Sequence, residues 1–291
     1  MPTNKHLVVC ANGQNLLDVS RKYLSSHDLL IIGQGVFLNI EPTFVVFEPK
    51  DIRSDLQLQE IAQTQSCSHS ISDWLLLSSL STLVSLKIEQ LQQTQHNLFA
   101  LVNPTYSASG IYAANPPPHS ILPNYFFVQE ADYSSMIKSL RKYFRLISKV
   151  HRFDSPLLNF RGTIARAISV GFSYGYDSVD IVGLNPSSNL YWWSSANSNL
   201  YRNDIISLKA KELHTSLSNL RKQFSGNNKH VGEYPHMPFS EAIAIVSKLY
   251  NRAGMQVKID SRDRLMRDAL NMYSLPFWTP PLHQPNQSWP Q

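Results

Sequence analysis

The sequence predicts an α/β protein in which helices cover both faces of a parallel β-sheet. Several short runs along the chain are apolar throughout instead of alternating with polar residues, which is typical of strands buried on both faces. Segments with the helical spacing of apolar residues separate these runs. Hydrophobic residues make up 43% of the 291 residues, which is enough for one large domain with a full core.

The first third of the chain holds four predicted strands and two predicted helices. Pro42 and Pro49 bracket the third strand and prevent its extension as a helix. The turn Ala11-Asn12-Gly13 closes the first strand, and Asn103-Pro104 stops the fourth. The strands are His6–Cys10, Leu29–Ile32, Phe44–Phe47 and Leu98–Val102, and the helices are Leu16–Leu24 and Ile71–Gln93.

The rest of the chain predicts five helices, two strands and several long loops. The helix Ala131–Val150 is amphipathic, with four basic residues on its solvent-facing side. Tyr106–Pro123 is predicted to be a loop long enough to carry a function, and the Pro-rich tail from Pro276 to be extended or mobile. The four basic residues are Lys138, Arg141, Lys142 and Arg145. The other predicted helices are Gly162–Tyr174, Leu208–Gln223, Phe239–Tyr250 and Arg262–Leu270. The two predicted strands are Ser178–Gly183 and Gln256–Ile259.

This order of elements predicts one Rossmann-like nucleotide-binding domain over residues 1–185. Residues 186–238 form a loop and lid region that is rich in aromatic residues and histidine. Residues 239–275 supply a helix, a strand and a helix that complete the domain as a small, lid-like helical part, and residues 276–291 are the tail.

Composition narrows the classes of partner. The net charge of +5 is spread along the chain, so we expect no nucleic acid partner, and the excess fits phosphates and anionic sugars. Cys10 and Cys67 form no Cys-x-x-Cys motif, which excludes a zinc ribbon or a redox motif of that kind. Two cysteines also give no disulfide framework, which fits a reducing cytoplasm. The start lacks the apolar core of a signal peptide, and the longest apolar stretch, Trp74–Leu86, is too short to span a bilayer. We expect a cytoplasmic protein; peripheral contact with the inner face of the membrane and a homo-oligomer stay open.

The strand–turn–helix segment His6–Leu24 is the first candidate ligand site. A dinucleotide fingerprint needs three spaced glycines, and this turn has only Gly13, so NAD and FAD are disfavoured. One glycine still lets backbone amides approach a ligand, and Asn12 can both donate and accept hydrogen bonds. A plain turn between a strand and a helix is the alternative.

Two more segments combine groups suited to an anionic sugar nucleotide. Arg161 and Thr163 stand at the head of a predicted helix, where the helix dipole would add to the attraction for an anion. The loop Tyr191–Tyr201 follows a strand end and holds four aromatic residues able to stack on sugars or bases. The alternatives are a helix cap with a surface arginine and a small hydrophobic cluster.

The histidines of the loop before Phe239–Tyr250 are candidates for acid–base chemistry. His230 and His236 lie six residues apart in this loop. No metal-ligand spacing such as His-Glu-x-x-His occurs, and neither does Asp-x-Asp or a Walker A motif. We therefore predict no bound metal.

Two segments together resemble the bacterial family 42 sialyltransferases. Val8–Leu16, VVCANGQNL, is similar to their opening GNGPSL-type turn, and Asn159–Gly183, NFRGTIARAISVGFSYGYDSVDIVG, is similar to their Asn-x-Arg-x-Thr/Ser segment with its Gly-Tyr turn and Gly-ended strand. Ile40–Asp51 resembles a strand of the wider MptE-like and flagellin-glycosyltransferase relatives. The order holds over about 6–265. The resemblance implies a GT-A-like variant of the Rossmann-like fold and transfer of a sugar from a CMP-activated donor to a glycan acceptor, with no separate cofactor.

The resemblance also implies roles for individual residues. His236 matches the catalytic base and Arg161 the arginine beside the active site, while Tyr191 and Tyr201 take the places of two tyrosines that assist the leaving phosphate. The implied catalytic residues are His236, Arg161, Tyr191 and Tyr201, and the implied nucleotide-binding residues are Asn12, Gly13, Gly33, Gln34, Thr163 and Asn185.

Departures from the family pattern keep other functions open. Gly33, beside Gln34, stands where the family has a pocket asparagine, and another pocket asparagine is replaced near Lys50. The donor could therefore carry a sialic acid, Kdo or another nonulosonic acid. One alternative is a Mg²⁺-dependent pterin pyrophosphokinase-like enzyme, for which only Glu48, Asp51 and Asp55 offer carboxylates. The other is a catalytically silent nucleotide-binding protein of the same fold.

Overall fold

A computed structural model of the chain describes residues 5–38, 40–47, 84–85, 87–95, 97–102, 105–107, 110–112, 119–129, 131–160, 162–188 and 237–283. It confirms the predicted α/β class. Six strands pair in parallel throughout and form one sheet in the order β10-β9-β1-β2-β3-β4. The strands are β1 (His6–Cys10), β2 (Asp28–Ile32), β3 (Phe44–Phe47), β4 (Phe99–Val102), β9 (Ser178–Val182) and β10 (Gln256–Ile259).

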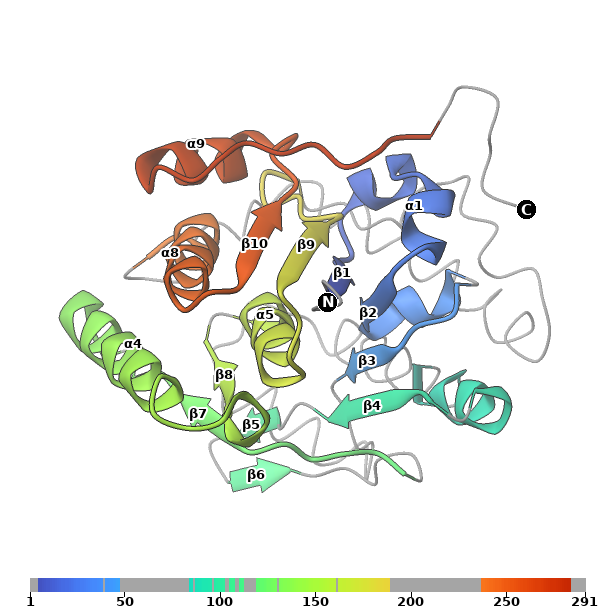
Figure 1. Cartoon of the computed structure of the whole chain (residues 1–291), viewed down its shortest axis with the longest axis horizontal. Helices are drawn as coiled ribbons and strands as arrows, with labels where there is room; N and C mark the ends of the chain where they lie inside the picture. The colour runs from blue at the N-terminus through green and yellow to red at the C-terminus, as the bar shows by residue number, and fades with distance from the viewer. Residues whose placement is uncertain are drawn as a thin grey trace, which may run out of the picture.

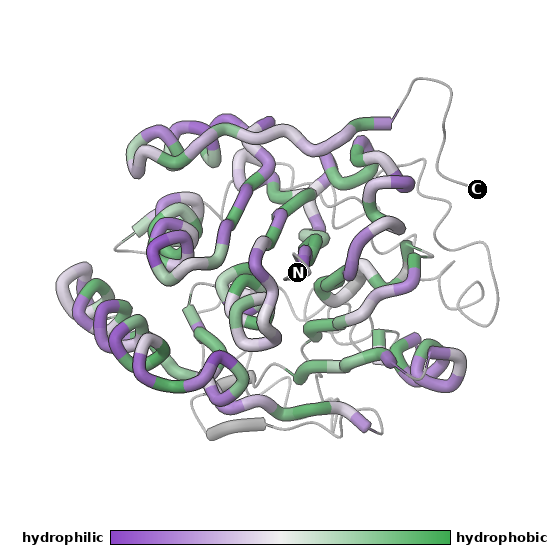
Figure 2. The backbone as a smooth tube through the Cα atoms, in the orientation of Figure 1, coloured by the Kyte–Doolittle hydropathy of each residue, from purple (hydrophilic) through white to green (hydrophobic). Residues whose placement is uncertain are grey.

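Alternate residues of the central strands feed two separate hydrophobic cores. In β1, Leu7 and Val9 belong to one core, whereas Val8 and Cys10 belong to the other. This two-sided burial explains why the strands read as continuous apolar runs, and Figure 2 shows hydrophobic residues concentrated along them. Cys10 is fully buried, as predicted, and burial raises the pKa of its thiol to about 12.

Helices cover both faces of the sheet (Figure 1). The face with the larger core is covered by α4 (Tyr133–Ile147), α5 (Thr163–Ser173) and α8 (Phe239–Arg252), and α9 (Arg264–Met272) packs against α8. On the other face lie the 3₁₀ helices η1 (Gln14–Asp18) and η2 (Gly33–Phe37), the short helix α1 (Arg21–Ser25) and the helical segment 87–94. No helix among the described residues is long and apolar enough to cross a membrane.

The prediction of one helix over Leu16–Leu24 is wrong, because the structure has η1 and α1 with Val19 extended between them. Val19 forms an antiparallel bridge with Leu282, and the amide of Ser20 donates to the carbonyl of Pro281 at 2.7 Å. The C-terminal segment therefore takes the backbone groups that a continuous helix would use. As a consequence, the turn after β1 leads into a 3₁₀ helix of five residues and lacks a strong helix dipole behind it.

The stretch predicted as a loop over Tyr106–Pro123 also contains structure. β5 (Thr105–Ser107) and β6 (Gly110–Tyr112) form an antiparallel pair, and Ile121 forms a parallel bridge with Leu101. The sequence did not predict the separate parallel pair of β7 (Tyr125–Phe127) and β8 (Leu157–Asn159). Three-residue strands are too short to show a period, which is why pattern analysis passes over them.

The C-terminal segment after α9 is extended up to residue 283, the last of the described residues. Trp278 forms a parallel bridge with Asp260 at the end of β10, and Leu282 reaches Val19. In Figure 1 this segment runs from α9 past the ends of β10 and β9 to the region of α1. It thereby ties the last part of the chain to the first.

Candidate functional site

The strand order contains one reversal, between β1 and β9. From β1 the chain builds β2, β3 and β4 on one side, and it then returns to add β9 and β10 on the other side. At such a reversal the loops after the two neighbouring strands lead away in opposite directions and leave a crevice outside the carboxyl ends. The loops that border this crevice are 11–13 after β1 and 183–185 after β9.

Two glycines close the base of this crevice. The amide of Ala11 donates to the carbonyl of Val182 at 2.9 Å, and the amide of Gly13 donates to the carbonyl of Gly183 at 2.7 Å. A Cβ atom on Gly13 would lie 2.5 Å from the carbonyl oxygen of Gly183 and 2.9 Å from Cβ of Asn185. The two loops therefore touch through their backbones, and position 13 has no room for a side chain.

Gly183 is held in the left-handed region, with φ at +71°, and its added Cβ would lie 2.7 Å from the carbonyl oxygen of Ala11. We expect Gly183→Ala to lower the free energy of unfolding by about 3 kcal/mol, since backbone strain and steric overlap add together. Denaturant unfolding monitored by circular dichroism measures this loss.

Gly33 provides the matched control. It also has a positive φ, +47°, but no atom of a described residue beyond its two chain neighbours lies within 4 Å of its added Cβ. Gly33→Ala should therefore lose only about 1 kcal/mol, the cost of the backbone conformation alone. Equal losses in the two variants would contradict the close contact between the loops after β1 and β9.

The loop after β2 lies beside the loop after β1. η2 begins at Gly33, and a Cβ atom on Gly35 would lie 3.8 Å from Oδ1 of Asn12 while overlapping the side chain of Ile31. The backbone of Gln34 belongs to this same turn. The structure thus brings Asn12, Gly13, Gly33 and Asn185 from three neighbouring strands to one edge of the sheet, as expected for the carboxyl ends of parallel strands.

The heads of α5 and α8 face the same edge. α5 has 11 residues, about 16 Å, and a short turn joins its end to the start of β9, so its first residue lies toward the carboxyl ends of the strands. Thr163 is that first residue. The N-cap is Gly162, with φ at +88° and no side chain to cap the helix, and its added Cβ would lie 3.7 Å from the Phe239 ring at the head of α8. Both helices therefore begin close together without a side-chain cap.

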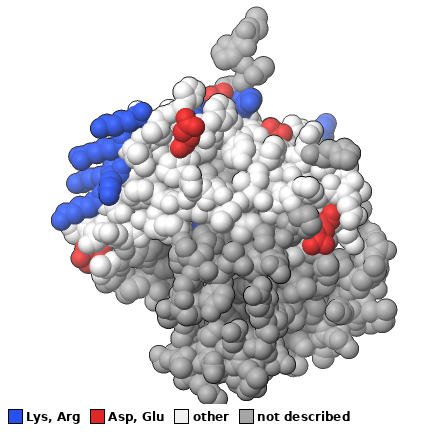
Figure 3. Space-filling model, turned by 90° about the horizontal axis from the view of Figure 1, so that it is seen from below, with Lys and Arg blue, Asp and Glu red and all other residues white. Residues whose placement is uncertain are grey.

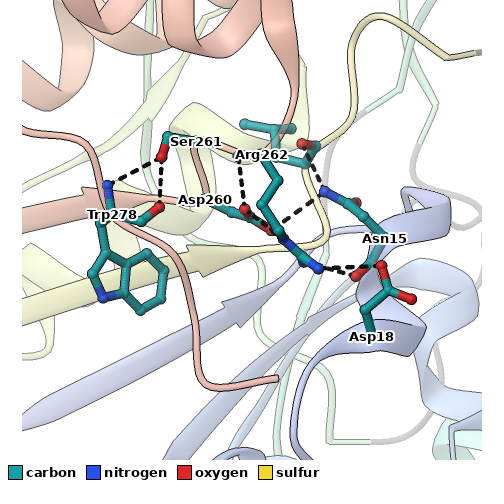
Figure 4. A network of polar contacts seen from close by, with 7 residues as sticks. Asn15, Asp18, Asp260, Ser261, Arg262 and Trp278 are labelled. Carbon is teal, nitrogen blue, oxygen red and sulfur yellow. Dashed lines mark hydrogen bonds and ion pairs between the residues drawn. The ribbon is translucent and has the colours of Figure 1, made fainter. Parts of the chain in front are cut away.

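A buried ion pair fixes the crevice on the β10 side (Figure 4). Asp260, which is fully buried, accepts from the guanidinium of Arg262 at 2.6, 2.9 and 3.1 Å. The same guanidinium donates to the carbonyl of Asn15 at 2.8 Å and contacts Asp18 at 3.2 Å. Figure 4 shows Arg262 reaching between the end of β10 and the turn after β1. The pair therefore anchors the first loop to the last strand.

The loop after β9 is held by the cap of α9. Asp263 caps α9 by accepting from the amide of Met266 at 3.0 Å, and it also accepts from the amide of Ser187 at 3.0 Å. The hydroxyl of Ser187 contacts Asp263 and lies 3.2 Å from Oδ1 of Asn185. The side-chain nitrogen Nδ2 of Asn185 forms no hydrogen bond with a described residue, which leaves it able to donate to a ligand.

Asn15 and Arg166 are site-edge residues that the sequence analysis did not single out. Asn15 donates to Asp260 at 3.3 Å, while its buried Oδ1 has no partner among the described residues. The guanidinium of Arg166 donates twice to Oδ1 of Asn159, at 2.7 and 3.1 Å, just before the head of α5. Asn159 ends β8 and Arg166 lies in the first turn of α5, so no periodic spacing in the sequence signals this pair.

Several predicted site residues fall outside the described residues, and their roles stay predictions. These are the four predicted catalytic residues, the rival histidine and the three carboxylates weighed for magnesium: His236, Arg161, Tyr191, Tyr201, His230, Glu48, Asp51 and Asp55. Within the described ranges no group of three or more His, Cys, Asp or Glu side chains is arranged to hold a metal ion.

Comparison with solved structures finds sialyltransferases at low similarity. A point variant of the sialyltransferase CST-II in complex with CMP has 14% identity over 97% of this chain and 95% of its own, with a TM-score of 0.39. A second variant with CMP has 13% identity, the same coverage and a TM-score of 0.42. CstII from Campylobacter jejuni with the substrate analogue CMP-3FNeuAc has 16% identity over 77% and 79%, with a TM-score of 0.33. No family model and no curated protein matches the chain. Similarity at this level assigns no activity to this chain.

Proposed function

We propose that this chain is a glycosyltransferase that moves a sialic acid, Kdo or a related nonulosonic acid from a CMP-activated donor to a hydroxyl of a glycan. The observation that carries the proposal is the meeting of Asn12, Gly13 and Asn185 at the reversal between β1 and β9. Open α/β sheets bind nucleotides at this place. Asn12 and Gly13 lie in the first segment that resembles the family 42 enzymes, and Asn185 follows the end of the second by two residues.

The edge of the sheet suits a single phosphate. Gly162 presents backbone without a side chain, and α5 begins with amide groups that no side chain caps. Thr163 could add its hydroxyl. The side-chain nitrogen Nδ2 of Asn185 is a donor without a described partner, so it can bind the polar edge of a base or sugar.

The proposed reaction is an inverting displacement. The acceptor oxygen attacks the anomeric carbon of the donor while the bond from that carbon to the CMP phosphate breaks, and His236 takes the hydroxyl proton. Arg161, Tyr191 and Tyr201 stabilise the charge that develops on the departing phosphate. The described neighbours of two of these residues support their cooperation, since Gly162 and Phe239 lie together at the heads of α5 and α8.

A thermal-shift experiment tests the proposal. CMP at a hundred times its Kd should stabilise the fold by about 2.7 kcal/mol, a rise in Tm of about 4 °C, whereas UDP and GDP should not. The shift should persist in EDTA, because the monophosphate leaving group can be neutralised by arginine and tyrosine hydroxyls and the sequence has no Asp-x-Asp motif.

Other outcomes separate the rival functions. A shift with ATP and Mg²⁺ alone would refute sugar transfer and favour the pyrophosphokinase-like enzyme. A CMP shift without any transfer from CMP-sialic acid or CMP-Kdo would indicate a silent nucleotide-binding protein, which the glycine at position 33 would explain.

A further inference from the structure

The outward face of α4 is a row of basic residues. Lys138, Arg141, Lys142 and Arg145 repeat at the helical spacing of three and four residues, are all exposed, and are continued by the exposed Lys149 just after the helix. α4 contains no acidic residue. In Figure 3, Lys and Arg side chains gather and project at the left edge, where α4 lies in Figure 1. We refer to these five residues as the basic face.

None of the five cations forms an ion pair with a described residue, although the chain offers acidic side chains elsewhere on its surface. Lys138 and Lys142, and likewise Arg141 and Arg145, lie four residues apart, where like charges destabilise a helix. The sequence therefore keeps an unfavourable arrangement that an external anionic surface would relieve.

The helix behind this face is rigidly attached. Its opposite side buries Met136, Leu140 and Tyr143 in the larger core. The hydroxyl of Tyr143 lies 2.7 Å from that of Tyr250 in α8 and donates to the carbonyl of Pro156 at 3.0 Å. The cations consequently project from a fixed, straight platform of about 10 Å between Lys138 and Arg145, and binding needs no rearrangement of the fold.

An exposed apolar side chain accompanies the basic face. Leu146 is 38% exposed beside Arg145. Cations together with an exposed aliphatic group match the interface of an anionic bilayer, where charged headgroups border the hydrocarbon. A nucleic acid would instead favour polar and stacking groups that read its grooves or bases.

We propose that the basic face of α4 docks the protein on the surface of an anionic membrane, with Leu146 entering between the headgroups. This inference does not depend on the proposed activity. A charge-driven contact of this kind weakens with salt, because the Debye length falls from about 8 Å at 0.15 M to about 3 Å at 1 M.

Vesicle co-sedimentation of the full chain tests the proposal. The protein should sediment with vesicles of one part phosphatidylglycerol to two parts phosphatidylcholine at low salt, and should stay in the supernatant with phosphatidylcholine alone or at high salt. The variant Lys138→Gln/Arg141→Gln/Lys142→Gln/Arg145→Gln should lose about a hundredfold or more in partition coefficient, since each cation near such a surface contributes several-fold.

A second set of four exposed cations gives the matched control, Lys22→Gln/Arg252→Gln/Arg264→Gln/Arg267→Gln. Both variants remove four positive charges from a chain of net charge +5, so a difference between them depends on position alone. The control should retain binding within about threefold. The Tm of each variant, measured without CMP, establishes that both are folded. If the fourfold α4 variant is unfolded, the double variant Lys138→Gln/Arg145→Gln replaces it.

Three results would overturn the proposal. The first is no sedimentation of the wild type with the anionic vesicles, and the second is an equal loss of binding in the two variants. The third is that the wild type binds a DNA duplex more tightly than the vesicles, and that the α4 variant loses this DNA binding while the control variant keeps it. The last result would assign the basic face to a nucleic acid.

Discussion

Arg262→Met should lower the free energy of unfolding by about 3 kcal/mol, because it leaves the carboxylate of Asp260 buried without its counter-charge. Asp260 is fully buried, while the side chain of Arg262 keeps 19% of its exposure, so water can replace part of the lost contact and the lower end of the usual range applies. The change also removes the hydrogen bond to the carbonyl of Asn15 that holds the turn after β1. Urea unfolding, with the midpoint and the slope fitted separately, measures the loss.

Arg264→Gln is the control for this prediction. Arg264 lies two residues further along at the start of α9, is exposed, and has no ion pair with a described residue, so its loss should change stability by less than about 0.5 kcal/mol. The double variant Asp260→Leu/Arg262→Met should recover part of the stability, because no buried charge then remains. If Arg262→Met costs no more than Arg264→Gln, the pair does not anchor the loop after β1.

His236→Ala should lower kcat for sugar transfer by about a hundredfold to ten-thousandfold, as expected when a general base is removed. An imidazole titrates near neutrality and can accept the hydroxyl proton without a large change in its pKa. The next residue, Met237, is buried, and α8 begins two residues later beside Gly162. Steady-state rates with saturating donor measure the loss in kcat, and calorimetric titration measures the affinity for CMP.

The affinity for CMP should stay nearly unchanged in this variant, because in the proposed mechanism the base acts on the acceptor. His230→Ala, six residues earlier in the same loop, is the matched control and should keep most of its activity. Near-normal turnover of His236→Ala, or a loss of CMP binding in its place, would show that position 236 is not the base.

The strands of the sheet were largely predictable from sequence because a strand buried on both faces must be apolar throughout. His6–Cys10 and Phe44–Phe47 have the bounds that this pattern predicted. The edge strand Gln256–Ile259 also has its predicted bounds, but its polar and apolar residues alternate. α4 likewise follows from one apolar stripe opposite a basic one, and only its ends differ from the prediction. In both cases the signal is local, since the residues that define the element also bury it.

The helix after β1 shows where local reasoning fails. The spacing from Leu16 to Leu24 is helical, and these residues are indeed buried, but the bridge between Val19 and Leu282 interrupts the helix. Its partner comes from the other end of the chain, and no window around Val19 contains that information. Tertiary contacts override weak helical propensity, particularly at a β-branched residue.

For the candidate site, the sequence determined which residues follow the strands, and the tertiary structure decided which of them meet. Gly13 and Gly183 come into contact only because β9 returns to pair with β1 after the chain has built β2, β3 and β4. Asp260 and Arg262 read as an ordinary surface pair in the sequence, but the fold buries the carboxylate and directs the guanidinium to the first turn. Hydrophobic periodicity records whether a strand is buried and not which strand lies beside it, so the order of the sheet, and with it the crevice, emerges only when the whole core packs.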